Sequence, residues 1–480
     1  MEQTAPMQIG DFLSQKLENI VSFTSREFSA KSGDNFSVFY LDCLVDRALI
    51  AKAVLAPIEA NENKLNEPQD IVNILSVMGE EFLTDKEQIV DKLLNGFVVI
   101  AINNKPEVCV LPMQGWQKRS VTEPPTSAVL KGPREGFTED YNSNLGLVRK
   151  RIKSADLKNE ELQIGRYTKT RVGIMYIKGI ADEVIVKKLK KRIQRIDIDG
   201  IIDSYYVSAF IEEKPSLLFK QIGSTEKPDV LASRLLEGRV AIVVEGSPIV
   251  LTVPFVLFED LQSPDDYYSH PLRATFARLI RVFGIVLAIS LPGIYVALQS
   301  YHYALLPIDF LIALQSSIQG LSFPPLIEIL FVLFLFEILN EASVRMPKYL
   351  GMALSVIGAL VLGDTAVQAG LISPPAVIMV AISGITLYTV PEEVESATVL
   401  RLFFTIIGGL AGFYGLTLAF IATTSYLMTF DSYGAPYFAP YSPIVLDDRK
   451  DGIFKQTLKK QITRPKSFPN SNRVRQKDNG

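Results

Sequence analysis

Three acidic residues stand inside long apolar stretches in the second half of the sequence: Glu328, Glu337 and Asp364. An ionised carboxylate costs about 2.5–3.5 kcal/mol at the centre of a membrane helix, so acids in such segments are candidates for function. A carboxylate that faces water or another subunit there favours the passage of cations. We therefore predict that at least one of the three contributes to an ion path. The alternative is that they only form ion pairs, with Arg345 or with a partner subunit.

The end of the same acidic segment carries a second charge pattern. Glu337, Glu341 and Arg345 follow each other at intervals of four residues, which places them along one face of a helix. We predict an ion pair between Glu341 and Arg345 where this helix ends.

Small residues recur at every fourth position in two apolar segments, and such spacing lets a second helix approach closely. We predict that these positions pack helices together and support self-association. They are Gly351, Ser355, Ala359 and Gly363 in the first segment, and Gly408 and Gly412 in the second.

The elements that carry these residues are apolar enough to cross a bilayer. Val282–Gln299, Thr365–Pro391 and Leu402–Phe430 contain no charged residue, and about 20 apolar residues span the hydrocarbon core. We predict a membrane domain over residues 271–430 with four to six segments, in which Leu402–Phe430 is one span. The short segment Ala304–Gln319 is expected to be amphipathic or re-entrant.

The orientation follows from the basic residues. Arg273, Arg278 and Arg281 place the preceding part on the cytoplasmic side. Residues 431–480 form a basic tail, which we expect either to be solvated and partly disordered or to lie beside anionic lipid. A tail on the cytoplasmic side requires an even number of crossings.

The first half of the chain is water-soluble in composition and contains a duplication. Residues 93–112 and 235–254 align without a gap, with Gly96/Gly238, Pro106/Pro248 and Pro112/Pro254 among the identities. Each copy reads as a helix end, a glycine stop, a strand, a turn and a second strand. We predict an α/β soluble head of two tandem duplicated subdomains, 1–115 and 171–270, bridged by residues 116–170, in front of an α-helical polytopic membrane domain. No signal peptide is recognisable, so the head is expected to stay on the side where it is made.

Several functional classes find no support in the sequence. There is no phosphate-binding glycine loop, and the two histidines have no partners at metal-ligand or triad spacing. Asp46, Asp182 and Glu183 lie near strand ends, where we expect solvated turns rather than catalytic acids. The net charge of −3 gives no affinity for nucleic acid. We predict no enzyme activity, no cofactor and no metal.

Two motifs flank the second subdomain. Opposite charges in a segment rich in proline and glycine commonly tie loops together by charge-assisted hydrogen bonds, so we expect the linker motif to be structural. The linker motif comprises Glu123, Pro124, Gly132, Pro133, Glu139 and Arg149, and the juxtamembrane motif comprises Asp265, Asp266, Tyr267 and Tyr268.

These motifs, together with Phe323-Pro324-Pro325 and Gly434, Pro436, Tyr437 and Pro440 after the last apolar run, resemble the A subunit of the GerA-type spore germinant receptors. The resemblance covers nearly the whole chain. One departure is Thr398, where that family often has an arginine ahead of Arg401.

The resemblance implies a nutrient-sensing complex in the inner membrane of a bacterial endospore, with the head on the spore-core side. The A subunit would assemble with a transporter-like B subunit and a lipoprotein C subunit. It would be the oligomeric, ion-conducting part, and the complex would release ions in response to germinants. Two alternatives stay open: an accessory membrane subunit of a dipicolinate channel, and a secondary transporter.

Overall fold

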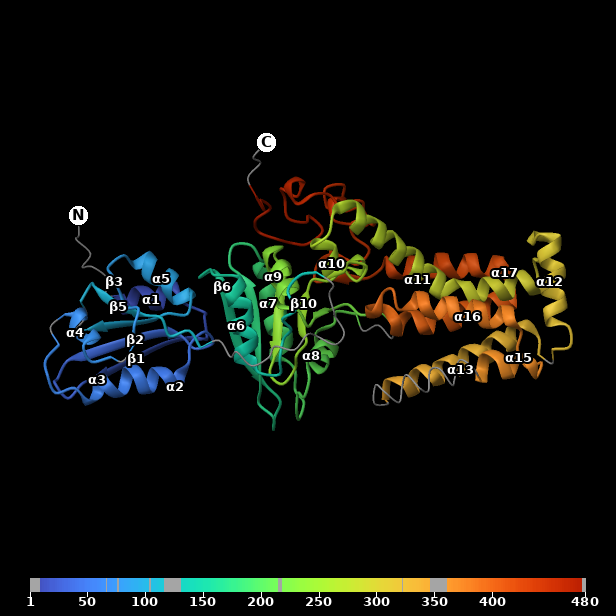
Figure 1. The fold of residues 1–480 in the computed structure, drawn as a ribbon. Helices are drawn as coiled ribbons and strands as arrows, with labels where there is room; N and C mark the ends of the chain where they lie inside the picture. The colour runs from blue at the N-terminus through green and yellow to red at the C-terminus, as the bar shows by residue number, and fades with distance from the viewer. Residues whose placement is uncertain are drawn as a thin grey trace.

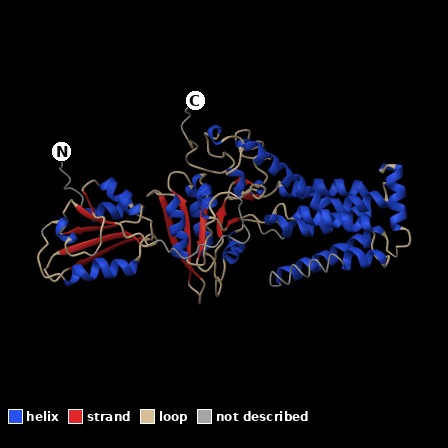
Figure 2. Cartoon of the chain, in the orientation of Figure 1, coloured by secondary structure: helices blue, strands red, loops and turns tan. Residues whose placement is uncertain are grey.

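The structure is a computed structural model, and it describes residues 9–65, 67–75, 77–102, 105–115, 131–214, 218–321, 323–345 and 361–476. Two α/β units and a helical part follow one another along the molecule (Figure 1). The strands of both large sheets lie in the two α/β units, and long helices make up the opposite end (Figure 2).

The first unit is a five-stranded antiparallel sheet in the order β1-β2-β4-β5-β3. Its central strand β4 is buried over its whole length, as expected for a short apolar run covered on both faces. The strands are β1 (Phe23–Ser29), β2 (Asn35–Leu41), β3 (Glu81–Leu83), β4 (Val98–Ile102) and β5 (Val108–Leu111). One face is covered by α1 (Ile9–Lys16) and α5 (Lys86–Leu94), and the other by the continuous run α2 (Arg47–Ile50), η1 (Ala51–Leu55) and α3 (Ala56–Ala60), with α4 (Pro68–Val72).

The second unit repeats this topology, with strand order β6-β7-β9-β10-β8. The shared order confirms that the head consists of two duplicated α/β units. The strands are β6 (Leu157–Ile164), β7 (Thr170–Ile177), β8 (Gly223–Thr225), β9 (Val240–Val244) and β10 (Val250–Val253). Helices α6 (Tyr141–Arg151) and α9 (Pro228–Leu236) cover one face, and α7 (Glu183–Gln194) and α8 (Ser204–Ile211) cover the other.

Equivalent aspartates begin the helices after β2 and β7. Asp46 Oδ1 accepts a hydrogen bond from the Ala48 N–H (2.9 Å), and Asp182 Oδ1 accepts one from the Val184 N–H (2.8 Å). Both acids therefore cap helix N-termini.

The second sheet starts earlier than the sequence suggests. Strand β6 pairs with β7 from Leu157 to Ile164, inside the segment that was expected to be a bridge. Because β6 is an edge strand, it carries charged residues such as Glu160 and Glu161 and lacks an apolar run. It also joins the two units, since the Asn159 N–H donates to the Asn19 carbonyl (3.0 Å).

Two stretches of the helical part, α11 and Pro391–Leu427, are long and apolar enough to cross a membrane by length and composition. The segment expected to be amphipathic or re-entrant forms the short helix α12 at the far end from the head (Figure 1). The helices are α10 (Pro264–Tyr267), α11 (Pro271–Ser300), α12 (Ile308–Ile318), α13 (Pro325–Arg345), η4 (Val361–Thr365), α15 (Ala366–Gln368), α16 (Pro374–Leu387) and α17 (Val394–Leu427).

Helix α17 is a hairpin rather than a single rod. Its 34 residues would extend about 50 Å if straight, yet both ends lie at the head. Lys220 Nζ is 3.4 Å from Glu392 Oε2 just before the helix, and Lys214 Nζ donates to the Thr429 carbonyl (3.0 Å) just after it. The backbone leaves helical geometry at Gly412 (φ 59°, ψ −150°). The prediction of one span over Leu402–Phe430 is therefore wrong, because the chain reverses at Gly412.

The expectation of a solvated, partly disordered tail is also wrong for the described residues. Arg464 Nε donates to the Leu236 carbonyl (2.6 Å), and the Ser471 N–H donates to the Ile180 carbonyl (2.9 Å). The tail thus packs along the second α/β unit, and its Arg464 side chain donates to a backbone carbonyl there. Its short elements are β11 (Asp431–Ser432), β12 (Ala435–Pro436), η6 (Asp448–Lys450) and η7 (Leu458–Lys460), and the remaining 3-10 turns are η2 (Leu257–Glu259), η3 (Tyr303–Leu305) and η5 (Pro391–Glu393).

Candidate functional site: the joint between head and helices

A buried ionic network connects the head to the first long helix. Asp266, in α10, accepts hydrogen bonds from Arg278 Nε (3.0 Å) and from Arg281 Nη1 (2.8 Å) on α11. The Arg278 side chain is fully buried, and its Nη1 also contacts Asp451 Oδ1 of the tail (3.0 Å). The neighbouring helices α10 and α11 and the distant tail therefore meet at one guanidinium group.

The arginines of this network keep the carboxyl group of Asp266 ionised. Burial alone would raise the pKa of Asp266, but the hydrogen bonds and positive charge of Arg281, with those of Arg278, outweigh it and hold this pKa below its usual value. The Asp266 carboxylate therefore stays ionised at neutral pH. Burial is also the largest influence on Lys455 of the tail, whose pKa is lowered and whose Nζ donates to the Asp266 carbonyl.

The aromatic residues of the juxtamembrane motif extend this joint. Tyr267 donates its hydroxyl hydrogen to Gln262 or Asp451, both at 2.9 Å. The Tyr268 hydroxyl donates to Asp229 Oδ2 at the start of α9 (2.8 Å). Burial, followed by the hydrogen bond to Asp229, raises the pKa of Tyr268 to about 12, so this hydroxyl stays protonated.

The linker motif packs against the same joint. The Lys131 N–H donates to Asp265 Oδ1 (3.0 Å), and Lys227 Nζ donates to the Pro133 carbonyl (2.8 Å). Gly132 has φ +114°, and a Cβ atom there would lie 2.5 Å from the Tyr268 ring. Only glycine fits this close approach in that conformation. Glu123 and Pro124 lie outside the described residues.

Within the described residues, no ion pair involves Glu139 or Arg149 of the linker motif. Glu139 is exposed and contributes its backbone carbonyl, which accepts from the Gly246 N–H (3.0 Å). Arg149 is buried and donates to the Leu157 carbonyl (3.1 Å). A neighbouring glutamate, Glu135, does form ion pairs, with Lys150 at 2.8 Å and with Arg151 at 2.7 Å. Spacing alone could not choose between these glutamates.

In the helical part, Glu328 acts as a cap. Its side chain is 1% exposed, and its Oε1 accepts a hydrogen bond from the Ser373 N–H (2.5 Å), the residue that precedes α16. A carboxylate at a helix N-terminus satisfies an otherwise unpaired N–H and interacts favourably with the helix dipole. Glu328 therefore ties α13 to α16.

Glu337 pairs with a residue that the sequence did not single out. It forms an ion pair with Arg401 of α17, which is 1% exposed. Arg401 Nη1 also contacts Ser383 Oγ (3.3 Å), and Ser383 donates to the Ala288 carbonyl of α11 (2.7 Å). One polar network thus links α13, α17, α16 and α11. A lone arginine inside an apolar run was the available signal, since such a charge needs a partner.

The remaining predicted acids are exposed. Arg345 Nε lies 2.6 Å from Glu341 Oε1, and both side chains are mostly accessible. Asp364 Oδ1 accepts a hydrogen bond from Gln368 Nε2 (2.8 Å), and no ion pair reaches Asp364 within the described residues.

The small residues have different environments. Gly351, Ser355 and Ala359 lie outside the described residues, and nothing lies within 4 Å of a Cβ placed at Gly363. A Cβ at Gly408 would lie 2.4 Å from the Gly293 carbonyl oxygen of α11, so these helices touch through their backbones. Gly412 forms the hairpin turn, where a Cβ would also meet the His302 ring at 2.8 Å.

Known proteins resemble this chain over most of its length. A family model described as Bacillus/Clostridium GerA spore germination protein matches residues 11–467. Spore germination protein KA of Bacillus subtilis (strain 168) is 35% identical over 447 residues, which is 92% of this chain and 82% of that protein. Spore germination protein A1 of the same organism is 32% identical, covering 91% and 90%.

Two further similarities are an uncharacterized membrane protein, YfkQ of Bacillus subtilis (strain 168), and a solved structure. YfkQ is 33% identical and covers 98% of this chain and 94% of its own length. The solved structure is the N-terminal domain of the A subunit of the Bacillus megaterium spore germinant receptor GerK3, 28% identical over 52% of this chain and 96% of that chain, with a TM-score of 0.40. The family match over nearly all of the sequence and the identity to full-length relatives establish that this chain belongs to the GerA family of spore germination proteins.

Proposed function

We propose that the chain is the A subunit of a germinant-responsive complex in the inner membrane of bacterial endospores, and that its helical part conducts ions. Membership of the GerA family supports the role in germination. The observation that carries the proposal further is the presence of acidic side chains within an apolar helical part that is joined to a large head by a buried ionic network.

We propose that the helical part crosses the membrane six times, with head and tail on the cytoplasmic side. The helical part begins and ends beside the head, because Tyr268, just before α11, contacts Asp229, and Thr429, just after α17, contacts Lys214. The reversal at Gly412 supports this count, since it gives α17 two antiparallel arms. An even number of crossings keeps the basic tail inside, as the distribution of basic residues requires.

For the ion path, Asp364 is the strongest of the three candidates. Glu328 caps α16 and Glu337 pairs with Arg401, so both have structural uses within one copy of the chain. The Asp364 side chain is exposed, and its carboxylate accepts a hydrogen bond from the side-chain amide of Gln368. A ring of such acids, one from each subunit, would raise the local concentration of cations.

Self-association would form that ring. The apolar residues Ile327, Phe334 and Ile338 of α13 are 46%, 63% and 48% exposed, and the small residues of 351–363 follow in the sequence. We propose that this region packs against neighbouring copies. The resemblance adds a transporter-like B subunit and a lipoprotein C subunit as partners, and the lipid bilayer covers the remaining apolar surface. We propose no cofactor, no nucleic acid partner and no catalysis.

A gene deletion tests the function. Spores that lack this chain are expected to lose the early release of potassium ions in response to some nutrients, and a plasmid copy is expected to restore it. Dipicolinate and potassium ions are measured in the same samples. Normal potassium release with delayed dipicolinate release would favour the accessory subunit of a dipicolinate channel.

One observation favours a secondary transporter as a second candidate. Broken helices are common in transporters, where freed carbonyls bind ions, and α17 is broken at Gly412. Here the Tyr301 hydroxyl lies 3.0 Å from the carbonyls of Gly409 and Leu410 and can donate its hydrogen to only one of them at a time. Uptake of a labelled nutrient that depends on Tyr301 would support the transporter.

A further inference from the structure

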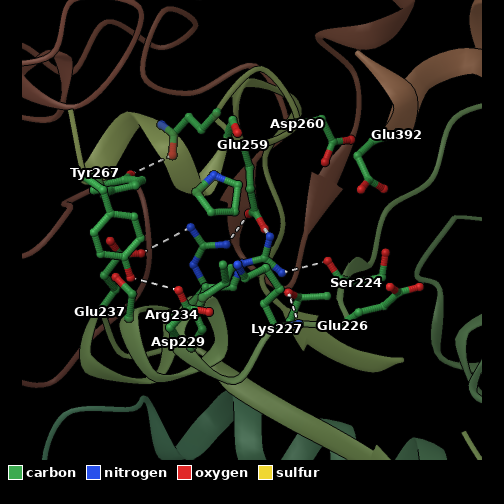
Figure 3. A pocket seen from close by; sticks show the side chains of 18 of the residues that line it. Ser224, Glu226, Lys227, Asp229, Arg234, Glu237, Glu259, Asp260, Tyr267 and Glu392 are labelled. Atoms are coloured by element: carbon green, nitrogen blue, oxygen red, sulfur yellow. Dashed lines mark hydrogen bonds and ion pairs between the residues drawn. The ribbon is translucent and has the colours of Figure 1, made fainter. Parts of the chain in front are cut away.

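A cavity of about 550 Å³ lies where the head, the juxtamembrane segment, the tail and the start of α17 come together. Its wall includes Glu226 and Asp229 around the start of α9, Tyr267 and Tyr268 at the end of α10, Glu392 before α17, and Leu458 of the tail. Figure 3 shows lining side chains around the cavity, with Glu226, Asp229, Tyr267 and Glu392 among those labelled. Sites for small molecules commonly have this size and lie between structural units.

The cationic side chains of the wall are already engaged. Lys227 Nζ donates to the Pro133 carbonyl (2.8 Å), and Arg234 Nη1 donates to the Ser224 carbonyl (3.1 Å). Arg239 forms ion pairs with Glu259 and with Glu237, the latter at 3.2 Å. These groups therefore use most of their hydrogen-bonding capacity within the protein.

The acidic side chains outnumber the basic ones, and four of them have a buried oxygen without a hydrogen bond within the described residues; those of Glu259 and Asp260 form ion pairs with Arg234 and Lys220. Glu226 Oε2 and Asp229 Oδ1 are buried and have no hydrogen-bond partner within the described part of the chain. A buried acceptor without a donor costs about 1–3 kcal/mol. A ligand that supplies N–H donors and positive charge would remove this cost.

Two other features of the wall indicate which chemical class of ligand the cavity would bind. Arg239 is 6% exposed, and its Nε has no acceptor within the described residues, so a ligand oxygen would complete it. The Tyr268 ring, which is 42% exposed, gives part of the wall an aromatic surface that suits both an apolar body and a cation. The Tyr267 ring adds apolar surface, and Lys455 Nζ already lies 4.5 Å from its centre. Within the described residues, no group of three or more Asp, Glu, His or Cys side chains could hold a metal ion.

We propose that this cavity binds a small organic cation, an amine that also carries a hydrogen-bond acceptor. Its charged group contacts Glu226 and Asp229, and its body lies against Tyr267 and Tyr268. Because the wall comes from the head, α10, the tail and the start of α17, an occupied cavity holds these four parts together. This inference does not rest on the proposed ion conduction, since binding is measured on the protein alone.

The test uses the full-length chain in nanodiscs of neutral lipid, with tyramine as the probe and tyrosol, its neutral alcohol analogue, as the matched control. Isothermal titration calorimetry is expected to give saturable tyramine binding with a Kd below about 1 mM and at least about tenfold weaker tyrosol binding. Asp229→Asn and Glu226→Gln are each expected to weaken tyramine binding about tenfold, because each removes a charge-assisted hydrogen bond.

Matched variants separate loss of the site from loss of the fold. Glu183→Gln removes an exposed acid of α7 elsewhere on the same unit and should bind tyramine like the parent chain. Ser233→Phe should abolish binding by filling the cavity, with all charges retained. Melting temperatures without probe identify variants that fail to fold. Equal binding of tyramine and tyrosol, no saturable tyramine binding to the parent, or unchanged affinity in folded Asp229→Asn and Glu226→Gln would overturn the proposal.

Discussion

At the scale of single residues, the joint depends on Arg278, a fully buried cation held by Asp266 and Asp451. Removing one partner of a buried ion pair leaves the other charge uncompensated, which typically costs 3–5 kcal/mol. The juxtamembrane acids are therefore not interchangeable: Asp266 neutralises this cation, whereas Asp265 holds the backbone of the linker motif.

We predict that Asp266→Asn lowers the free energy of unfolding of the head–helix joint by about 3–5 kcal/mol, because Arg278 keeps its charge without its main partner. Denaturation of the full-length protein in nanodiscs, followed by the fluorescence of a probe at the joint, measures this change. Asp199→Asn, at an exposed acid that is 3.9 Å from Arg166, is the control and should change stability little. A stability equal to that of the parent would contradict the role of the network.

The stabilising effect of Asp266, measured with the same variant, should depend on pH in a defined direction. The pKa of Asp266 is lower in the folded protein than its usual value of about 3.9. Its stabilising contribution is therefore fully present above that usual value and is lost as the pH falls through the folded pKa. The stability difference between the parent and Asp266→Asn should stay constant from about pH 7 to 5 and shrink below about pH 4. A stability difference between the two proteins that increased as the pH fell would contradict this prediction.

At the scale of elements, the hairpin of α17 determines how the helical part returns to the head. Gly412 has φ 59° and ψ −150°, a conformation essentially limited to glycine. Gly408, four residues earlier, has no side chain and so lets α17 touch Gly293 of α11. Two glycines four residues apart thus have two different tasks, a turn and a close helix contact.

We predict that Gly412→Ala strongly reduces the amount of folded protein, because the substitution combines backbone strain of about 1–3 kcal/mol with a contact between the new Cβ and His302. Gly10→Ala is the control, since a Cβ there would make only an ordinary contact with the Phe39 ring at 3.4 Å. Membrane accumulation and melting temperature are measured for both. Equal accumulation of the two variants would mean that α17 has no turn at Gly412.

The sequence was informative where the pattern was local. The repeat of residues 93–112 at 235–254 predicted the two β4–β5-type hairpins, and both sheets contain them in equivalent positions. It was uninformative where a contact joins distant segments. Strand β6 is polar because it lies at an edge, and the pairing of Glu337 with Arg401 depends on how α13 and α17 pack. The folded tail was missed because its basic side chains bind backbone carbonyls, which leave no sequence signature.

At the scale of the whole molecule, the head, the tail and the start of the helical part form one connected body. The tail reaches the second α/β unit through Arg464 and Ser471 and reaches α11 through Asp451. The head therefore contacts both ends of α17, through Lys220 and Lys214, and the tail connects it to α11. This arrangement suits a protein that converts an event at one part into a change among membrane helices.

We predict that the tip of the α17 hairpin is accessible from the side opposite the head. In a variant without Cys43 and Cys109, a cysteine introduced by Tyr414→Cys, next to the turn and 74% exposed, should react with a membrane-impermeant maleimide added outside spheroplasts. A cysteine introduced by Leu446→Cys, in the tail and 71% exposed, should react only after lysis. External labelling of the tail would mean an odd number of crossings.

The central claim, that the helical part carries an ion path lined by acids, is tested most directly by early potassium release from spores after addition of nutrient. Asp364→Asn, Glu328→Gln and Glu337→Gln are compared with Glu341→Gln, which alters the exposed pair with Arg345, after immunoblots establish equal protein levels. Because a ring of carboxylates favours cations, the account predicts that at least one of the three, foremost Asp364→Asn, slows potassium release while Glu341→Gln does not. Parental release rates in all three variants would contradict the account and place the acids among the packing and pairing residues.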